Sequence, residues 1–231
     1  MRKGLDYLNK VKIFDGGMGS ELERLSISYD FVEDLNIDNP EVIQSIHLSY
    51  KDSDFITTNT FGLNKFKYKG KYSIKDVSKK AIENASVTNK CVFFDIGPTG
   101  CLMEPIGNLS FDDAYEAFKE VVLATYNLVD GYILETFSDL LEIKAAILAV
   151  KENCDKPVFA TMTFDKNGRT LTGTTPEIMV NTLEGLGVDA LGVNCSLGPK
   201  ELLVIVDRIC KCAHIPIIVQ PNRGIPKYLN G

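Results

Sequence analysis

Short apolar runs that alternate with longer segments of helical periodicity are the feature of this sequence that most restricts its fold. Each run is rich in β-branched or aromatic residues and is followed by residues typical of turns. The pattern predicts strands at 13–15, 55–59, 92–96, 132–135, 158–163, 190–194 and 217–220. Strands that alternate with helices in this way indicate a parallel sheet with right-handed crossover connections, so the fold class is α/β.

Helices are predicted between these strands. The clearest patterns cover 39–53, which starts with Asn39 as N-cap, and 198–212. Two further helices are expected to start after Ser110 and Ser138, because serine is a preferred N-cap residue.

Polar residues at the ends of the predicted strands distinguish between two parallel architectures. Almost every strand ends in a residue that can react or form hydrogen bonds, and in a barrel these strand ends converge on one mouth. An open sheet would spread them along a line, and the G-x-G-x-x-G motif of a dinucleotide fold does not follow the first strand. We therefore predict a fold of the (β/α)8 TIM-barrel type, in which the strand ends meet at one mouth. The strand-end residues are Asp15, Asn59, Thr60, Asp95, Glu135, Thr136, Thr161, Thr163, Asn194, Cys195, Gln220 and Asn222.

The length of 231 residues predicts a single domain that comprises residues 1–231. A typical barrel has about 250 residues and needs an eighth strand with its helices, whereas Gly231 follows soon after the seventh predicted strand. The last strand and its helices are therefore expected to be missing from this chain.

Charge and composition restrict the partners. The formal net charge of −6 argues against nucleic acid or an anionic membrane as the main partner, because both require clustered Lys and Arg. The basic run KFKYKGKY, residues 65–72, could stack on bases, but a solvated loop is the favoured interpretation. Without a signal-peptide pattern or a span of about 18 apolar residues, a cytoplasmic protein with reduced cysteines is expected.

Several motifs could bind a small molecule, and each also has a purely structural interpretation. In FDGGMGSEL, residues 14–22, Asp15 could hold an ammonium and the glycines could admit a carboxylate, or the segment is a plain connection. TTNTFG (57–62) and DIGPTG (95–100) are more typical of turns. Glu135 suits an acid/base or ammonium-binding role, and Arg169 lies in a loop that covers the mouth or is solvated.

Cys195, at the end of the predicted strand 190–194, could be a nucleophile, a metal ligand or a small packing residue. A nucleophile would need a base, but His47 lies in a helical pattern and His214 precedes the last predicted strand, at the end opposite the mouth. A zinc site needs three or four protein ligands. Cys210 and Cys212 are poor candidates for these, and Cys101 keeps a small chance. Taken alone, Cys195 is therefore most simply a packing residue.

Seven motifs in order along the chain resemble the homocysteine S-methyltransferase family. The resemblance covers residues 12–226 and is greatest for the homocysteine-binding barrel of cobalamin-dependent methionine synthases. The motifs are DGGMGSELE, SYKDSDFITTNTFG, DIGPTG, ILETFSDLLEIKAA, TMTFDKNGRTLTGTTPE, GVNCSLGPKEL and QPNRGIP.

The resemblance implies specific roles for residues of this chain. Cys195 matches a zinc-binding cysteine, and the zinc would bind homocysteine as a thiolate that accepts a methyl group to give methionine. Asp15 and Glu135 match acidic residues around the homocysteine ammonium, with Glu135 also in a catalytic role. The other implied substrate-binding residues are Gly16, Gly17, Thr60, Phe61, Asn194 and Asn222.

One departure from the family pattern concerns the metal. The family's other two zinc ligands are adjacent cysteines in a GGCCG motif, and this sequence has no adjacent cysteines. Zinc should therefore bind weakly or not at all to these residues alone.

The implied methyl donor is methylcobalamin, on cobalamin- and folate-binding domains or subunits elsewhere. S-methylmethionine or betaine is an alternative donor. An inactive remnant that binds an amino acid or a partner is an alternative function. Unpaired edges of an incomplete barrel would favour a homo-oligomer.

Overall fold

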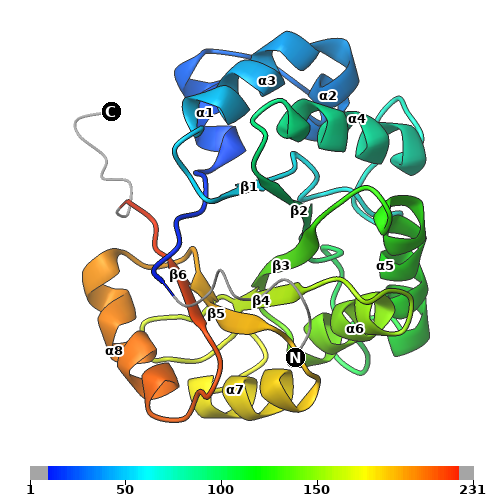
Figure 1. The fold of residues 1–231 in the computed structure, drawn as a ribbon. Helices are drawn as coiled ribbons and strands as arrows, with labels where there is room; N and C mark the ends of the chain where they lie inside the picture. Colours follow the sequence, from blue (N-terminus) through cyan, green and yellow to red (C-terminus); the bar gives the residue numbers. More distant parts are fainter. Residues whose placement is uncertain (1–9, 224–231) are drawn as a thin grey trace, which may run out of the picture.

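The computed structural model describes residues 10–223, which form a parallel six-stranded sheet surrounded by helices (Figure 1). The strands pair in their order along the chain, and every neighbouring pair is parallel. A helix lies in each connection between consecutive strands, which confirms the predicted α/β alternation. The strands are Phe55–Thr57 (β1), Cys91–Ile96 (β2), Gly131–Phe137 (β3), Val158–Met162 (β4), Ala190–Asn194 (β5) and Ile217–Gln220 (β6).

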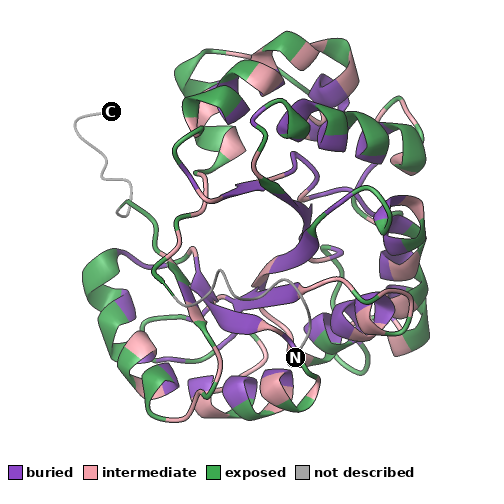
Figure 2. Cartoon of the chain, in the orientation of Figure 1, coloured by how far each residue is buried: buried purple, intermediate pink, exposed green. Residues whose placement is uncertain are grey.

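The helices lie outside the sheet, and their inward faces are buried (Figures 1 and 2). Four short helices precede β1 and the other five each connect two strands. They are α1 (Met18–Arg24), the 3-10 helix η2 (Val32–Asp34), α2 (Leu35–Asp38), α3 (Pro40–Ser49), α4 (Ile74–Ser86), α5 (Phe111–Thr125), α6 (Leu140–Lys151), α7 (Pro176–Gly185) and α8 (Pro199–Cys210).

The sheet is curled, because aromatic rings from distant strands meet on its inner side. Phe55 of β1 and Phe159 of β4 have ring centroids 5.8 Å apart, whereas β1 and β4 would be about 14 Å apart in a flat sheet. Phe14 and Phe93 complete this aromatic cluster. The structure is therefore a curled half-barrel with a packed interior. A closed eight-stranded barrel is not present in residues 10–223.

The first predicted strand and some helix boundaries are wrong. Residues 13–15 form only an isolated bridge, Phe14 to Phe55, because the chain turns away at the glycines that follow. The N-cap of α6 is Asp139, not Ser138, since its carboxylate accepts a 2.7 Å hydrogen bond from Leu141 N. Ser110 caps α5 as predicted.

The predicted helix 39–53 ends earlier than expected, at Ser49, where Tyr50 N bonds to His47 O and tightens the last turn. Asn39 is its N-cap, but the Asn39 side chain makes no capping hydrogen bond.

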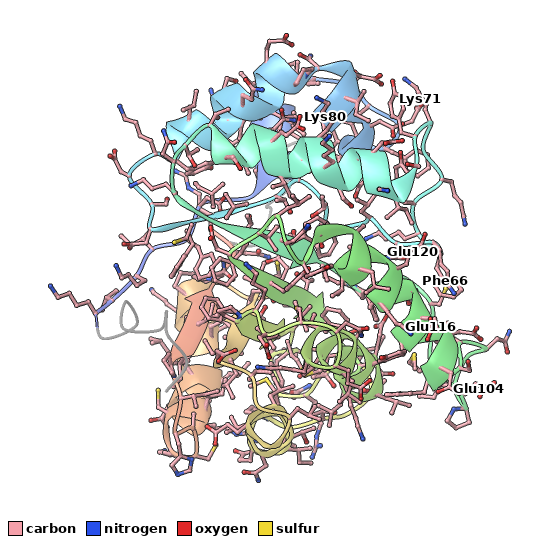
Figure 3. All side chains as sticks on the ribbon, turned by 45° about the vertical axis from the view of Figure 1, so that its right-hand side comes forward. Phe66, Lys71, Lys80, Glu104, Glu116 and Glu120 are labelled. Carbon is pink, nitrogen blue, oxygen red and sulfur yellow. The ribbon has the colours of Figure 1, made fainter. Side chains whose placement is uncertain are left out.

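The basic run 65–72 does not present a uniformly positive surface. Lys71 forms an ion pair with Asp38, and Lys67 lies over the ring of Phe61 at 4.3 Å. Phe66 and Lys71 lie on a flank that also carries Glu104, Glu116 and Glu120 (Figure 3). These acidic neighbours would repel a phosphate backbone.

All six cysteines are free thiols. No helix within residues 10–223 is long and apolar enough to cross a membrane.

Candidate active site

A pocket of about 1190 Å³ opens at the carboxyl ends of the strands and continues along the inner side of the half-barrel. Every residue to which the family resemblance assigned substrate or metal binding lines this pocket. They are Asp15, Gly16, Gly17, Thr60, Phe61, Glu135, Asn194, Cys195 and Asn222. The fold thus brings together residues that are up to 207 positions apart (15 to 222) in the sequence.

Glu135 lies near the end of β3, on the inner side. Ile133, two residues earlier, belongs to the interior cluster of apolar side chains, and side chains two apart on a strand share a face. The register between β3 and β4 shifts after Leu134, and Thr136 has a positive φ of 62°. Burial raises the pKa of Glu135, while a hydrogen bond from Asn194 lowers it.

Asn194 connects the ends of three neighbouring strands. It is only 2% exposed. Its Nδ2 donates to Glu135 Oε2 at 3.2 Å and to Thr136 Oγ1 at 2.7 Å. Its Oδ1 accepts from Thr136 N and from Thr161 Oγ1, both at 3.0 Å. Because every polar atom of its side chain is engaged, Asn194 fixes the position of Glu135.

Cys195 follows Asn194 and is half-buried, with its thiol directed to the same group of side chains. Cys195 and Ser196 have φ of 58° and 59°, so the chain turns sharply at the end of β5. The sulfur lies 3.6 Å from Thr136 Oγ1 and 3.5 Å from Asn194 Nδ2. Burial raises the pKa of the Cys195 thiol, so it stays protonated at neutral pH and is a poor nucleophile by itself.

Asp15 directly follows the bridge between Phe14 and Phe55 of β1 and lines the mouth. Its Oδ2 accepts from Thr57 N at 2.9 Å and its Oδ1 accepts from Thr57 Oγ1 at 3.0 Å. Burial raises its pKa to about 7 in spite of these bonds. A Cβ atom at the neighbouring Gly16 would lie 2.5 Å from the Tyr50 hydroxyl, so a larger residue there would displace the Tyr50 side chain.

Thr60 and Phe61 form the wall of the pocket after β1. Thr60 is 1% exposed and donates to the main-chain oxygen of Asp95 at 2.8 Å, which ties this loop to β2. The ring of Phe61 packs against Gly97, where a Cβ atom would lie 2.5 Å from the ring. Asn222, by contrast, is exposed and is held by a hydrogen bond from its N to Leu197 O.

Asp95, His47 and Gln220 also line the pocket, although the sequence assigned none of them a binding role and predicted Asp95 and Gln220 only as strand ends at the mouth. Asp95 could have been found from the alternation in β2, because Phe93 faces the interior and Asp95 must share its face. His47 lies on α3 and is neutral at pH 7, since burial lowers its pKa to about 4. Only the tertiary structure brings that helix to the pocket.

Other candidates lie away from the pocket. The Arg169 guanidinium donates to Gly173 O inside its own exposed loop. His214 is exposed and bonds to Glu184. Cys101 is also exposed, and no cysteine other than Cys195 lines the pocket.

The described residues do not fit a complete zinc site. Residues 10–223 contain no group of three His, Cys, Asp or Glu side chains that could hold a metal ion. Cys195 supplies one thiol, whereas zinc in proteins takes three or four protein ligands. We therefore derive no metal-dependent step from these residues.

Comparison with known proteins connects this pocket with a family. A family model described as homocysteine S-methyltransferase matches residues 12–231. The chain belongs to the homocysteine S-methyltransferase family. This match covers nearly the whole chain. It includes the pocket residues that carry the sequence resemblance.

Curated members of this family that resemble the chain are methionine synthases. The protein of Mycobacterium tuberculosis (strain ATCC 25618 / H37Rv) is 32% identical over 251 aligned positions, which cover 96% of this chain and 21% of that protein. The protein of Mycobacterium leprae (strain TN) is 29% identical over 245 positions, covering 94% and 20%. The chain thus spans about a fifth of the length of these methyltransferases.

Solved structures show the same fold. The homocysteine methyltransferase MmuM from Escherichia coli in its metallated form has a TM-score of 0.84 and 20% identity, over 95% of this chain and 87% of that chain. Its apo form has a TM-score of 0.79 and 22% identity, over 95% and 86%.

Proposed function

We propose that this chain is the homocysteine-binding barrel of a cobalamin-dependent methionine synthase. The observation that carries the proposal is the convergence of Asp15, Asp95 and Glu135 on a pocket that also holds Cys195. Homocysteine has a positive ammonium, a carboxylate and a thiol. The pocket offers acidic groups for the first and a sulfur-binding position for the last.

The ammonium is expected to lie between Asp15 and Glu135. None of the salt bridges between described residues involves either side chain. A buried carboxylate without a cation is costly, so a bound ammonium would stabilise its ionised form. Gly16 and Gly17 line the same end of the pocket and leave room for the substrate carboxylate beside the main chain.

The substrate sulfur is expected to lie near Cys195. We propose Cys195 as one zinc ligand of the whole protein, with the other ligands supplied from outside the described residues. The role of Glu135 in catalysis is to hold the substrate in position for methyl transfer.

We propose methylcobalamin as the methyl donor. Other domains or subunits would bind the cobalamin and the folate, because the relatives are methionine synthases about five times longer. S-methylmethionine or betaine would be the alternative donor. A catalytically inactive amino-acid-binding chain is the second candidate, and the incomplete metal site in residues 10–223 is the observation that favours it.

Isothermal titration calorimetry with homocysteine tests the binding proposal. We expect the chain to bind homocysteine, and to bind 4-mercaptobutanoate, which lacks the amino group, at least about tenfold more weakly, since a charged hydrogen bond contributes 1.5–3 kcal/mol. Glu135→Gln should lose most of this discrimination. Glu116→Gln is the matched control, because Glu116 lies on the outer surface of α5.

Equal affinity for the two ligands would contradict the proposed site. Methyl transfer from methylcobalamin to homocysteine by the whole protein separates the enzyme from the inactive alternative. Transfer that stops in Cys195→Ala supports the enzyme, while binding without transfer supports the alternative.

A further inference from the structure

Asp95 lines the pocket, but the substrate contacts proposed above do not include it. It lies on β2 with only 6% exposure. Its main chain is held rigidly, because Asp95 N donates to Thr58 Oγ1 at 3.1 Å and Asp95 O accepts from Thr60 Oγ1 at 2.8 Å. Its side-chain Oδ1 is buried and has no hydrogen-bond partner among the described residues.

The groups that face the Asp95 carboxyl are acidic. Asp95 pairs with Ile133 in the register of β2 and β3, so its side chain lies beside that of Glu135 on the inner side of the sheet. Burial raises the pKa of Asp95, and the charges of Glu135, Asp15 and Glu33 raise it further. Two neighbouring buried carboxylates repel each other when both are ionised, so one of the pair is expected to hold a proton. No salt bridge among the described residues brings a cation to either group.

The neighbours of the pair decide which carboxyl holds the proton. Glu135 accepts a hydrogen bond from Asn194, and such a bond stabilises an ionised carboxylate. Asp95 receives no comparable bond at Oδ1. Burial and the charge of Glu135 both raise the pKa of Asp95.

We propose that Asp95 is a neutral carboxylic acid whose proton is donated to Glu135, so that Asp95 positions Glu135 as the ionised acceptor of the substrate ammonium. The inference rests on the proposed homocysteine site and adds a positioning residue to it. Glu135 is then held from two sides, by the amide of Asn194 and the acid of Asp95. Asp15 supplies the second negative charge.

Two substitutions at Asp95 separate a neutral donor from an anion. Asp95→Asn keeps the shape and supplies an N–H donor to Glu135, whereas Asp95→Leu keeps the approximate volume without a donor. Calorimetry should show homocysteine affinity within about threefold of the unmodified chain for Asp95→Asn, and at least about tenfold weaker for Asp95→Leu. If Asp95→Asn is as weak as Asp95→Leu, Asp95 acts as an anion and the proposal is wrong. If Asp95→Leu binds normally, Asp95 has no positioning role.

Infrared spectroscopy tests the proton directly and needs no ligand. At about pH 8.5 Asp15 is ionised, and the carbonyl stretch of protonated carboxyls should be weaker in Asp95→Asn than in the unmodified chain. An unchanged band would overturn the proposal.

The infrared result also distinguishes the two proposals. If the unmodified chain does not bind homocysteine, the proposed function fails, while the band still decides whether Asp95 is neutral. Circular dichroism shows whether each variant folds. If Asp95→Leu does not fold, the binding and the infrared band of Asp95→Asn still test the proposal.

Discussion

At the scale of single residues, the mouth of the half-barrel gathers acids whose charge depends on what is bound. Asp15, Asp95 and Glu135 are all buried enough for their pKa values to rise. A buried acid without a cation favours its neutral form, and an arriving ammonium favours the ionised form. A cationic ligand would therefore displace the proton that Asp15 holds below about pH 7, whereas Asp95 keeps its own.

The pH dependence of binding follows from Asp15. Burial raises its pKa to about 7, so it becomes neutral below that pH and attracts an ammonium less. We expect homocysteine affinity to fall by up to about tenfold between pH 8 and pH 6, as proton linkage requires. Calorimetry over this range measures it.

Asp15→Asn is the matched variant for this prediction, because the amide keeps the shape and cannot titrate. Its affinity should be lower at pH 8 and nearly independent of pH. An unchanged pH profile in Asp15→Asn would assign the dependence to another group.

At the scale of elements, close packing between strands sets the shape of the pocket. Gly192 of β5 lies against β6, and a Cβ atom there would be 1.8 Å from Ile218 O. The ends of both strands carry pocket residues, Asn194 and Gln220, which pair in register. A side chain at position 192 would therefore separate the two strands that shape this wall.

Gly192→Ala should lower the free energy of unfolding by about 2 kcal/mol or more, since overpacking that moves backbone is costly. Gly185→Ala is the control at the end of α7, where a Cβ atom would meet nothing within 4 Å. It should be neutral or slightly stabilising. Urea denaturation of both variants measures the difference, and equal effects would contradict the close packing.

At the scale of the whole molecule, one edge of the sheet, at β6, has no further strand beside it within residues 10–223. Within residues 10–223, β6 pairs only with β5. Apolar side chains near this edge are exposed, with Leu203 at 65%, Val204 at 69% and Val219 at 43%. An open strand edge beside apolar surface is a template for association with another chain.

We expect the 231-residue chain to self-associate through this edge, which light scattering over a range of concentrations measures. Val219→Lys should reduce the association, because a charge on an edge strand opposes pairing. Leu123→Lys is the control, as Leu123 is a 51% exposed apolar residue on α5. A monomer at all concentrations, or equal effects of the two substitutions, would contradict the prediction.

The sequence by itself determined the parallel α/β alternation, because burial on both faces of a parallel strand requires continuous apolar runs such as 158–162. It also determined the pocket residues at strand ends, such as Glu135 and Asn194, since all parallel strands end on the same side. Family resemblance added Asp15 and Cys195, which local patterns left ambiguous. Local rules were less accurate at boundaries, where Asp139 replaced Ser138 as the cap.

Only the tertiary structure decided what surrounds each of these residues. The register of β2 and β3 places Asp95 beside Glu135, and Asp95 Oδ1 has no hydrogen-bond partner within residues 10–223. The fold also brings His47 from α3 to the pocket and leaves Arg169 in solvent. The physical reason is that protonation and positioning depend on burial and on neighbours from distant segments. Sequence periodicity gives the direction of a side chain, whereas packing alone gives its partners.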